Sequence, residues 1–175
     1  MSSISAPSRS LRALGGLAFA WAGLVAGISF LEAPVKFTAP SLTLEVGLDV
    51  GRHVFGALNR TELILALISA GLMWASRPRR GVWIALGLAW TAVVLQTVWL
   101  LPALDARAVL ILSGGRPPAA PELHVLYGLD EGAKVLALLA AGWLSSRPKA
   151  AILPSRLDRP AAQPSGDGAV HQPTL

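Results

Sequence analysis

The chain contains no cysteine and few charged residues, and each absence excludes a class of function. Without cysteine the chain has no disulfide, no thiol redox centre, no iron–sulfur cluster and no cysteine-ligated zinc. Only 14% of the 175 residues are charged and 53% are hydrophobic, whereas soluble domains carry about 25% charged residues. This composition predicts an integral membrane protein with one small domain.

The chain also lacks the uninterrupted apolar runs that four complete membrane spans would need. Fourteen uncharged residues separate Glu62 from Arg77, and twelve separate Lys134 from Arg147. A span takes about 20 residues at a rise of 1.5 Å each. The second span must therefore begin before Glu62, and the fourth must contain Asp130, Glu131 and Lys134. Ionisable groups at membrane depth are costly, and they mark functional sites by default.

Four apolar segments predict an all-α fold, a polytopic membrane protein built as a four-transmembrane-helix bundle. Continuous apolar runs of this kind do not show the alternation of barrel strands. The expected boundaries are a first span over 12–31, a second ending at Ser76, a third from Gly81 to about Leu101, and a fourth ending between Leu144 and Ser146. The first span has 19 apolar residues, longer than a cleavable signal segment, so it is expected to be retained.

The predicted domain organisation has three parts. Residues 1–11 form a cytoplasmic N-terminus, 12–146 the transmembrane domain, and 147–175 a proline-rich tail that is expected to be disordered. In the connection after the first span, Pro34 and Pro40 are expected to break the chain, and Ser41 is the expected cap of the next helix. A helix over 42–76 would be about 52 Å long, so part of it must bend or leave the bilayer.

The distribution of basic residues predicts the orientation of the chain. Nine of the fifteen Lys and Arg residues lie in the N-terminus, in the loop after Ser76 or in the tail. Basic residues gather on the cytoplasmic side, so the chain is expected in the inner (plasma) membrane with both termini cytoplasmic. The net charge of +5 does not indicate nucleic-acid binding, because the arginines adjoin apolar segments. The segment 101–115 is expected to form a short interfacial helix, and Pro121 to open the fourth helix.

A polar layer is expected within the bundle. Counted from the basic ends of the spans, one polar group from the first, second and third helices and two from the fourth fall at heights of about 18–24 Å. These five residues are Ser29, Glu62, Gln96, Glu131 and Lys134. Charged side chains at this depth face the bundle interior and pair with one another.

The fourth helix carries a polar stripe that reaches this layer from the outer side. His124, Tyr127, Glu131 and Lys134 follow one another at spacings of 3, 4 and 3, which places them on one helical face. The predicted substrate- or ion-binding residues are Glu62, Gln96, His124, Tyr127, Glu131 and Lys134. Outer-loop polar residues expected above them are Glu32, Lys36, Arg52 and His53. The two glutamates are interpreted as exchangeable acids, with Lys134 as their counter-charge.

Structural interpretations of the same residues stay open. Asn59 and Glu62 fit a capping box that would begin the second helix. Glu131 and Lys134 at i, i+3 can simply pair, and His124 can be an interfacial residue. Glycine pairs at 23 and 27, at 47 and 51, and at 128 and 132 favour close helix packing.

The resulting functional hypothesis is binding or translocation of a small solute or ion. No catalytic residue, metal-ligand set or cofactor is assigned, and no nucleophile–base pair points to an enzyme. The expected partner is the lipid bilayer, and transport would need a dimer because four helices enclose a narrow pore. The alternatives are an accessory subunit of a membrane complex and, less favoured, a haem protein ligated by His53 and His124.

Three sequence blocks resemble those of small four-helix bacterial membrane proteins. They are 28–37 (ISFLEAPVKF), 51–62 (GRHVF through Glu62) and 124–134. The pattern is more distantly similar to the eukaryotic transmembrane protein 205-like family, over roughly residues 12–146. The resemblance implies a helical membrane domain and carries no catalytic residue.

Overall fold

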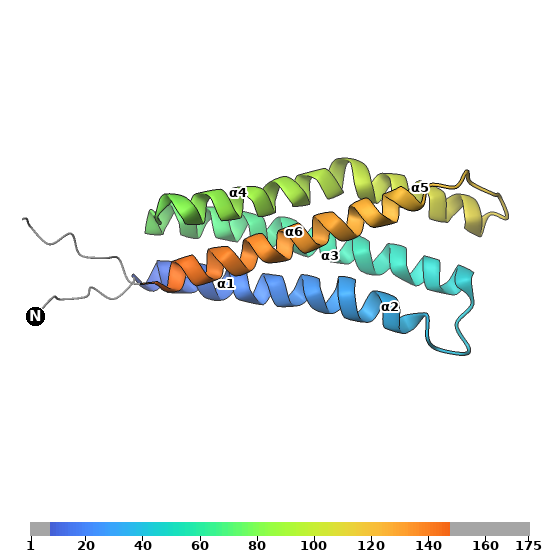
Figure 1. Cartoon of the computed structure of the whole chain (residues 1–175), viewed down its shortest axis with the longest axis horizontal. Helices are drawn as coiled ribbons and strands as arrows, with labels where there is room; N and C mark the ends of the chain where they lie inside the picture. The colour runs from blue at the N-terminus through green and yellow to red at the C-terminus, as the bar shows by residue number, and fades with distance from the viewer. Residues whose placement is uncertain (1–7, 148–175) are drawn as a thin grey trace, which may run out of the picture.

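The computed structural model describes residues 8–147, which form an elongated bundle of four helical runs (Figure 1). No strand occurs in this range, so the predicted all-α, four-helix architecture is confirmed. Three runs are long and apolar enough to cross a membrane by length and composition, namely Arg9–Lys36, Leu44–Ser76 and Arg80–Leu112. The tail predicted over 147–175 lies outside the described residues, apart from Arg147.

The first run consists of α1 (Arg9–Val25), the π-helical η1 (Ala26–Glu32) and α2 (Ala33–Lys36). The expectation that it ends at residue 31 and breaks at Pro34 is wrong. The backbone N–H of Ala33 donates to the carbonyl of Ile28, five residues earlier, so the wider π turn is already present where the proline enters. Pro34 then follows as the second residue of α2, inside the continuous helix Arg9–Lys36.

The second run is the single helix α3 (Leu44–Ser76), which ends at the residue predicted. Its cap is Thr43 rather than Ser41, because the Thr43 side chain accepts a hydrogen bond from the backbone N–H of Val46 at 3.3 Å. Asn59 lies well inside this helix, so the capping-box interpretation of Asn59 and Glu62 is wrong.

The third run consists of α4 (Arg80–Leu95), the π-helical η2 (Gln96–Leu100) and α5 (Leu101–Leu112). The segment expected as a separate interfacial helix is therefore a continuation of the third helix. The fourth run is α6 (Pro121–Ser146), which begins at the predicted proline and ends within the predicted range.

The apolar core lies in the half of the bundle where the chain enters and leaves. There α1 and α6 approach closely, since a Cβ added to Gly15 would lie 3.2 Å from the Ser145 Cβ. The buried side chains that fill this half include Leu14, Met73, Leu86 and Leu138, each at most 1% exposed. Of the predicted glycine pairs, Gly47 and Gly51 do have close neighbours, namely the Phe37 ring and Lys36 Nζ. The prediction is wrong at Gly23, Gly27 and Gly128, where no atom of the described chain lies within 4 Å of an added Cβ.

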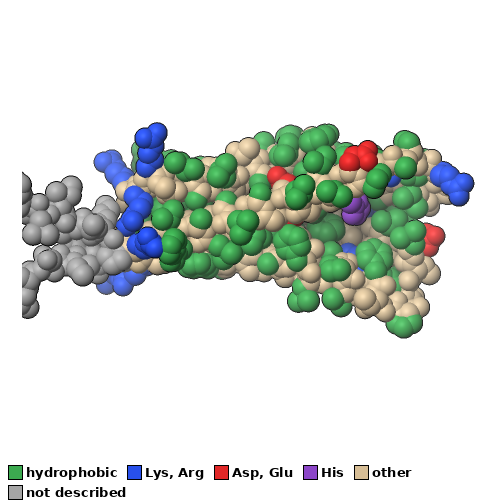
Figure 2. Space-filling view, in the orientation of Figure 1, with side chains coloured by type: hydrophobic (Ala, Val, Ile, Leu, Met, Phe, Trp, Pro, Cys, Tyr) green, Lys and Arg blue, Asp and Glu red, His purple; other side chains and the backbone are tan. Residues whose placement is uncertain are grey.

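Basic side chains gather at the end of the bundle where α1 begins (Figure 2). The described residues there include no acid, and the basic ones are Arg9, Arg12, Arg77, Arg79, Arg80 and Arg147. Arg79 donates a hydrogen bond to the carbonyl of Arg147 at 3.0 Å, which ties the start of α4 to the end of α6. The two long loops and all described acids lie toward the other end or within the bundle.

Candidate functional site

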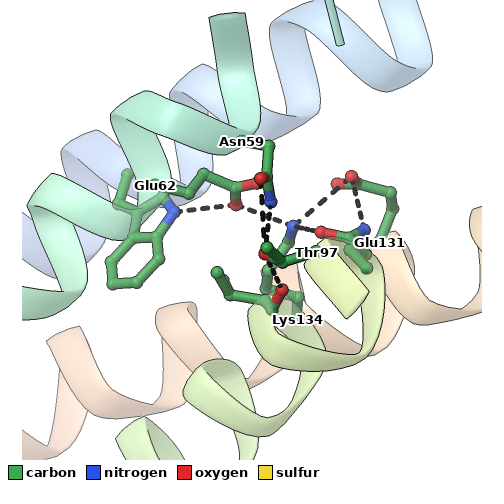
Figure 3. A network of polar contacts seen from close by, with 8 residues as sticks. Asn59, Glu62, Thr97, Glu131 and Lys134 are labelled. Atoms are coloured by element: carbon green, nitrogen blue, oxygen red, sulfur yellow. Dashed lines mark hydrogen bonds and ion pairs between the residues drawn. The ribbon is translucent and has the colours of Figure 1, made fainter. Parts of the chain in front are cut away.

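Lys134 is the centre of a buried polar cluster in the middle of the bundle (Figure 3). Its Nζ lies 2.7 Å from Glu62 Oε1 and 3.3 Å from Glu131 Oε1, and it donates to Gln96 Oε1 at 2.6 Å. These four side chains are each at most 1% exposed. The cluster therefore joins α3, η2 and α6 through one ammonium group.

Two further hydrogen bonds complete the cluster. Gln96 Nε2 donates to Glu131 Oε1 at 2.7 Å, so the amide uses both ends to hold the lysine and the acid in place. From α1, Trp21 Nε1 donates to Glu62 Oε1 at 3.0 Å. Every helical run thus contributes a polar group, and the predicted convergence of Glu62, Gln96, Glu131 and Lys134 is what the structure has.

The cluster holds two carboxylates and one ammonium. Lys134 contacts the Oε1 atom of each acid, and the Gln96 amide also donates to Oε1 of Glu131. Among the described residues, none reaches the buried Glu131 Oε2 with a hydrogen bond of ordinary geometry. Tyr127, one turn earlier on α6, interacts with this carboxylate through its charge and through a side-chain hydrogen bond. Glu131 is thus a buried acid whose Oε2 makes no hydrogen bond of ordinary geometry and whose carboxylate has Tyr127 as a further neighbour.

The residue that the first helix contributes was not predicted correctly. Ser29 was expected in the layer, but its Oγ is buried without a partner in the described structure, and Trp21 takes its place. The expected height of Ser29 was counted from Ala13, the first residue of the apolar run, but the helix begins four residues earlier, at Arg9. Counted from Arg9, Trp21 lies about 18 Å up the helix, level with Lys134, and Ser29 lies about 30 Å up.

A cavity of about 1260 Å³ lies above the cluster, between the outer parts of the four runs. Its lining includes Glu131 and Tyr127 at the end of the cavity nearest the cluster. Beside them, Asn59 Nδ2 donates to Thr97 Oγ1 at 2.9 Å, a pair visible in Figure 3. Sites for small molecules usually measure about 300–1,000 Å³, so this space is larger than a metal ion or an inorganic anion needs.

The walls of the cavity are mainly apolar and partly aromatic. The rings of Phe55 and Tyr127 meet edge to face, with centroids 5.3 Å apart. Further apolar lining residues are Phe30, Phe37, Leu48, Leu101, Leu104 and Ile111. A polar end beneath apolar walls is the usual design of a site for an amphipathic ligand.

Both π segments and the prolines after them border this cavity. Phe30 belongs to η1 and Thr97 to η2. Pro34 follows Phe30 by four residues and Pro102 follows Thr97 by five, and all four line the cavity. The Leu101 N–H donates to the Gln96 carbonyl, the same five-residue step that precedes Pro34. A π turn is wider than an α turn and is common at functional sites.

The outer residues predicted as polar contacts are mostly paired. Lys36 Nζ lies 3.5 Å from Glu32 Oε1 and 5.4 Å from the centroid of the Phe55 ring. Arg52 Nε donates to Asp105 Oδ1 at 2.6 Å. Lys36 and Arg52 line the cavity, whereas Glu32 does not.

The two candidate haem ligands are placed differently. His124 is exposed and lines the cavity. The His53 side chain is 77% exposed and its Nδ1 contacts the Asp49 carbonyl at 2.8 Å, away from the cavity lining. The residues present do not favour axial ligation by both histidines.

Three polar residues of the site were not among the predicted site residues, namely Trp21, Asn59 and Thr97. Trp21 could have been found by counting its height from the true start of the helix. Asn59 and Thr97 could have been found because they lie at the same height, about 26 Å from Ser76 and from Arg80 respectively, and carry an amide and a hydroxyl that can bond to each other.

Comparisons with protein-family models, curated proteins and solved structures found no match to this chain. The similarity to the transmembrane protein 205-like family therefore stays a prediction.

Proposed function

We propose that this chain is a four-span inner-membrane protein, with both termini cytoplasmic, that binds a small solute from the outer side. The basic end of the bundle supports this orientation, since basic residues collect on the cytoplasmic side. The cavity then opens on the opposite side. The fourth helix, α6, crosses the membrane with Glu131 and Lys134 buried against the other runs.

The observation that carries the proposal is the position of Glu131 at the inner end of the cavity. Its side chain is fully buried, and no hydrogen bond of ordinary geometry reaches Oε2 from the described residues. A buried acceptor without a partner costs about 1–3 kcal/mol, more when it is charged. A ligand that donates to this oxygen would offset the cost.

Binding is better supported than passage through the bundle. Below Lys134 the helices pack through apolar side chains such as Leu86 and Leu138, neither of which is exposed. A solute at Glu131 would meet this packed core. Translocation would require the helices to rearrange or a second copy of the chain to contribute to the path.

Cysteine accessibility tests the proposal, because the chain has no cysteine of its own. Gly128 lines the cavity and has no atom within 4 Å of an added Cβ, so Gly128→Cys fits without strain. Gly71 also has open space but lies on the exposed surface of α3. In liposomes, Gly128→Cys should react with a water-soluble thiol reagent, and Gly71→Cys should be protected by lipid.

Both variants should react fully after denaturation, which controls for thiol oxidation. If folded Gly128→Cys is as inert as Gly71→Cys, the cavity is not open to water and the proposed function fails. If Gly71→Cys reacts readily in liposomes, the second run does not span the bilayer.

A structural role for the cluster is the competing account. It is favoured by the contribution of all four runs, since Lys134 and Trp21 together connect α1, α3, η2 and α6. An accessory subunit would need no more than this. The two accounts differ in what Glu131 contributes to stability.

A further inference from the structure

We infer that the ligand of the cavity is an amphipathic anion, with an apolar chain along the walls and a negatively charged group held by Arg60 and Arg107. This inference rests on the proposed function and names its ligand class. It follows from the charges that line the cavity, from which of them are already paired, and from where the unpaired ones lie.

The charges that line the cavity are mostly positive. Four basic side chains and two acidic ones line it, namely Lys36, Arg52, Arg60 and Arg107 against Asp105 and Glu131. A concave site with one sign of charge in excess, between walls of low dielectric constant, focuses its field and concentrates ions of the opposite sign. The lining therefore favours an anion over a cation.

Two of the four basic side chains are already compensated. Arg52 Nε lies 2.6 Å from Asp105 Oδ1. Lys36 Nζ lies 3.5 Å from Glu32 Oε1, is buried, and makes no hydrogen bond within the described part of the chain. Lys36 therefore adds to the positive potential at the mouth more than it offers a direct contact to a ligand.

The other two basic side chains have no acid beside them. Neither Arg60 nor Arg107 forms an ion pair with any acid of residues 8–147. Arg107 Nη1 donates to the carbonyl of Pro118 at 2.6 Å, which holds the side chain in place but leaves its charge uncompensated. Guanidinium groups match carboxylate, sulfonate and phosphate oxygens in geometry as well as in charge.

Arg60 is the more informative of the two because of its depth. It lies 16 residues before Ser76, about 24 Å from the basic end of α3, and the hydrocarbon core of a bilayer is about 30 Å thick. Its guanidinium is directed toward the mouth, since a Cβ added to Gly56 would lie 3.9 Å from Arg60 Nη2. A charge at this depth marks a functional site by default, and the cavity provides room for its partner.

The acid of the cavity lies farther inward than this guanidinium. Counted from the basic ends of their helices, Gly56 is at about 30 Å and Glu131 at about 22 Å. The Glu131 carboxylate also has Lys134 Nζ at 3.3 Å. An anion beside Arg60 is therefore separated from Glu131, whose Oε2 is left to a neutral donor at the inner end of the ligand.

The walls require a ligand with a hydrocarbon part. The faces of Phe37 and Phe55 are occupied by Lys36, whose Nζ lies 5.6 and 5.4 Å from the two ring centroids. The other apolar lining residues include Phe30, Leu48, Leu101, Leu104 and Ile111. The volume of about 1260 Å³ is also far more than an inorganic anion fills. Charge and walls together describe an anion that carries an apolar chain.

A protection experiment on Gly128→Cys tests the ligand class. Gly128 lines the cavity at about 27 Å, between the heights of Glu131 and Gly56. The protein is placed in phosphatidylcholine liposomes and labelled with a neutral maleimide. The probes are hexanesulfonate, methanesulfonate, hexanol and hexyltrimethylammonium, of which two share the charged group and three share the chain.

Hexanesulfonate should be the probe that protects. At ten times its dissociation constant it should slow labelling about tenfold, because the unoccupied fraction falls as 1 + [L]/Kd. Methanesulfonate lacks the chain, and hexanol and hexyltrimethylammonium lack the negative charge, so each should protect far less at the same concentration.

Arginine variants in the Gly128→Cys background locate the charged group. Arg60→Gln should abolish protection by hexanesulfonate, Arg60→Lys keeps the charge and should retain it, and Arg107→Gln should weaken it several-fold. Arg116→Gln is the matched control, because Arg116 lies at the same outer end but does not line the cavity. Each rate is compared with that of the same variant without probe, since a nearby guanidinium also changes the reactivity of a thiol.

A monodisperse elution profile and a helical circular dichroism spectrum show that each variant is folded. Liposomes that contain phosphatidylglycerol then distinguish the two sources of such an anion. If a membrane lipid occupies the site, labelling of Gly128→Cys should be slow in these liposomes without any probe, and Arg60→Gln should restore the rate. If the anion comes from solution, the rate should be the same in both kinds of liposome.

Each remaining outcome decides a different point. If hexanol or hexyltrimethylammonium protects as well as hexanesulfonate, or if no probe protects a reactive Gly128→Cys, the ligand class is wrong and the open cavity still stands. Equal protection by methanesulfonate would contradict the apolar chain. Protection that persists in folded Arg60→Gln, or that Arg116→Gln also abolishes, would overturn the position of the charged group. A Gly128→Cys that is unreactive in phosphatidylcholine liposomes without probe would overturn the proposed function itself.

Discussion

Among residues 8–147, Lys134 is the single cation that contacts both buried acids, and its position explains why the charges can be buried at all. Its three polar contacts are at 2.6, 2.7 and 3.3 Å. Buried ion pairs add little net stability over apolar packing, but removing one partner leaves an uncompensated charge. The cost of a substitution in this cluster therefore depends on which charges remain.

Lys134→Met should be the most damaging single change in the cluster. It leaves Glu62 and Glu131 buried without a cation, and the expected loss of stability is about 3–5 kcal/mol. Adding Glu62→Gln to it should restore part of the loss, because one of the two stranded acids is removed. Thermal unfolding in lipid nanodiscs measures both. A double variant no more stable than Lys134→Met would show that charge balance does not govern this cluster.

At the residue scale, the sequence predicted the members of the cluster better than their roles. Glu62, Gln96, Glu131 and Lys134 could be found from height and helical face alone. Asn59 could not, because a residue that suits a helix cap by type can equally lie in a helix interior. Here it donates to Thr97, on another helix, and the tertiary contact outweighs the local preference.

At the element scale, two helices widen in the same way. In each, a π segment ends within two residues of a proline, at Pro34 and at Pro102. A proline in a regular α-helix clashes with the carbonyl four residues earlier. The five-residue hydrogen bonds before both prolines avoid that carbonyl, and both segments border the cavity.

Pro102→Ala should narrow the cavity by allowing η2 to relax toward an α-helix. The helix itself should become more stable, by up to about 3 kcal/mol, while labelling of Gly128→Cys should become several-fold slower. Pro121→Ala is the matched control, because Pro121 also lines the cavity but sits in the first turn of α6, where proline has no cost. Unchanged labelling of Gly128→Cys in the Pro102→Ala background would show that the π segment does not determine the width of the cavity.

Close helix approach also shows the limit of sequence patterns at this scale. Glycines four residues apart favour packing in membranes, yet Gly23, Gly27 and Gly128 have no neighbour within 4 Å of an added Cβ. Between α1 and α6 the close approaches are instead at Gly15, where an added Cβ would lie 3.2 Å from the Ser145 Cβ, and at Gly142, where it would lie 2.9 Å from the Phe19 ring. Such a pair depends on the register between α1 and α6, and register is not visible in either helix alone.

At the scale of the whole molecule, charge is divided between the two ends. The end where the chain enters and leaves the bundle carries arginines, and the described acids lie beyond it (Figure 2). The four-helix architecture could be predicted because it depends only on composition and the length of apolar runs. The cavity could not, since its shape depends on how the outer parts of the four runs are placed, and it is bordered by two π segments that composition does not encode.

The division of charge predicts the orientation of the bundle in the cell. Ser113 is exposed after α5, and Ser146 is exposed at the end of α6, beside the arginines. In intact cells, Ser113→Cys should react with a membrane-impermeant maleimide, and Ser146→Cys should react only after permeabilisation. The reverse pattern would place the cavity on the cytoplasmic side and contradict the proposed topology.

The stability of Glu131→Gln tests most directly whether this acid serves binding or structure. The variant keeps the shape of the side chain and leaves Glu62 and Lys134 as a balanced pair at 2.7 Å. If Glu131 is held for a ligand, the free energy of unfolding of the variant should lie within about 1 kcal/mol of the wild-type value or above it. That is the expected result when a buried functional acid is neutralised. A loss as large as that of Lys134→Met would instead make Glu131 a structural member of the cluster and contradict the account.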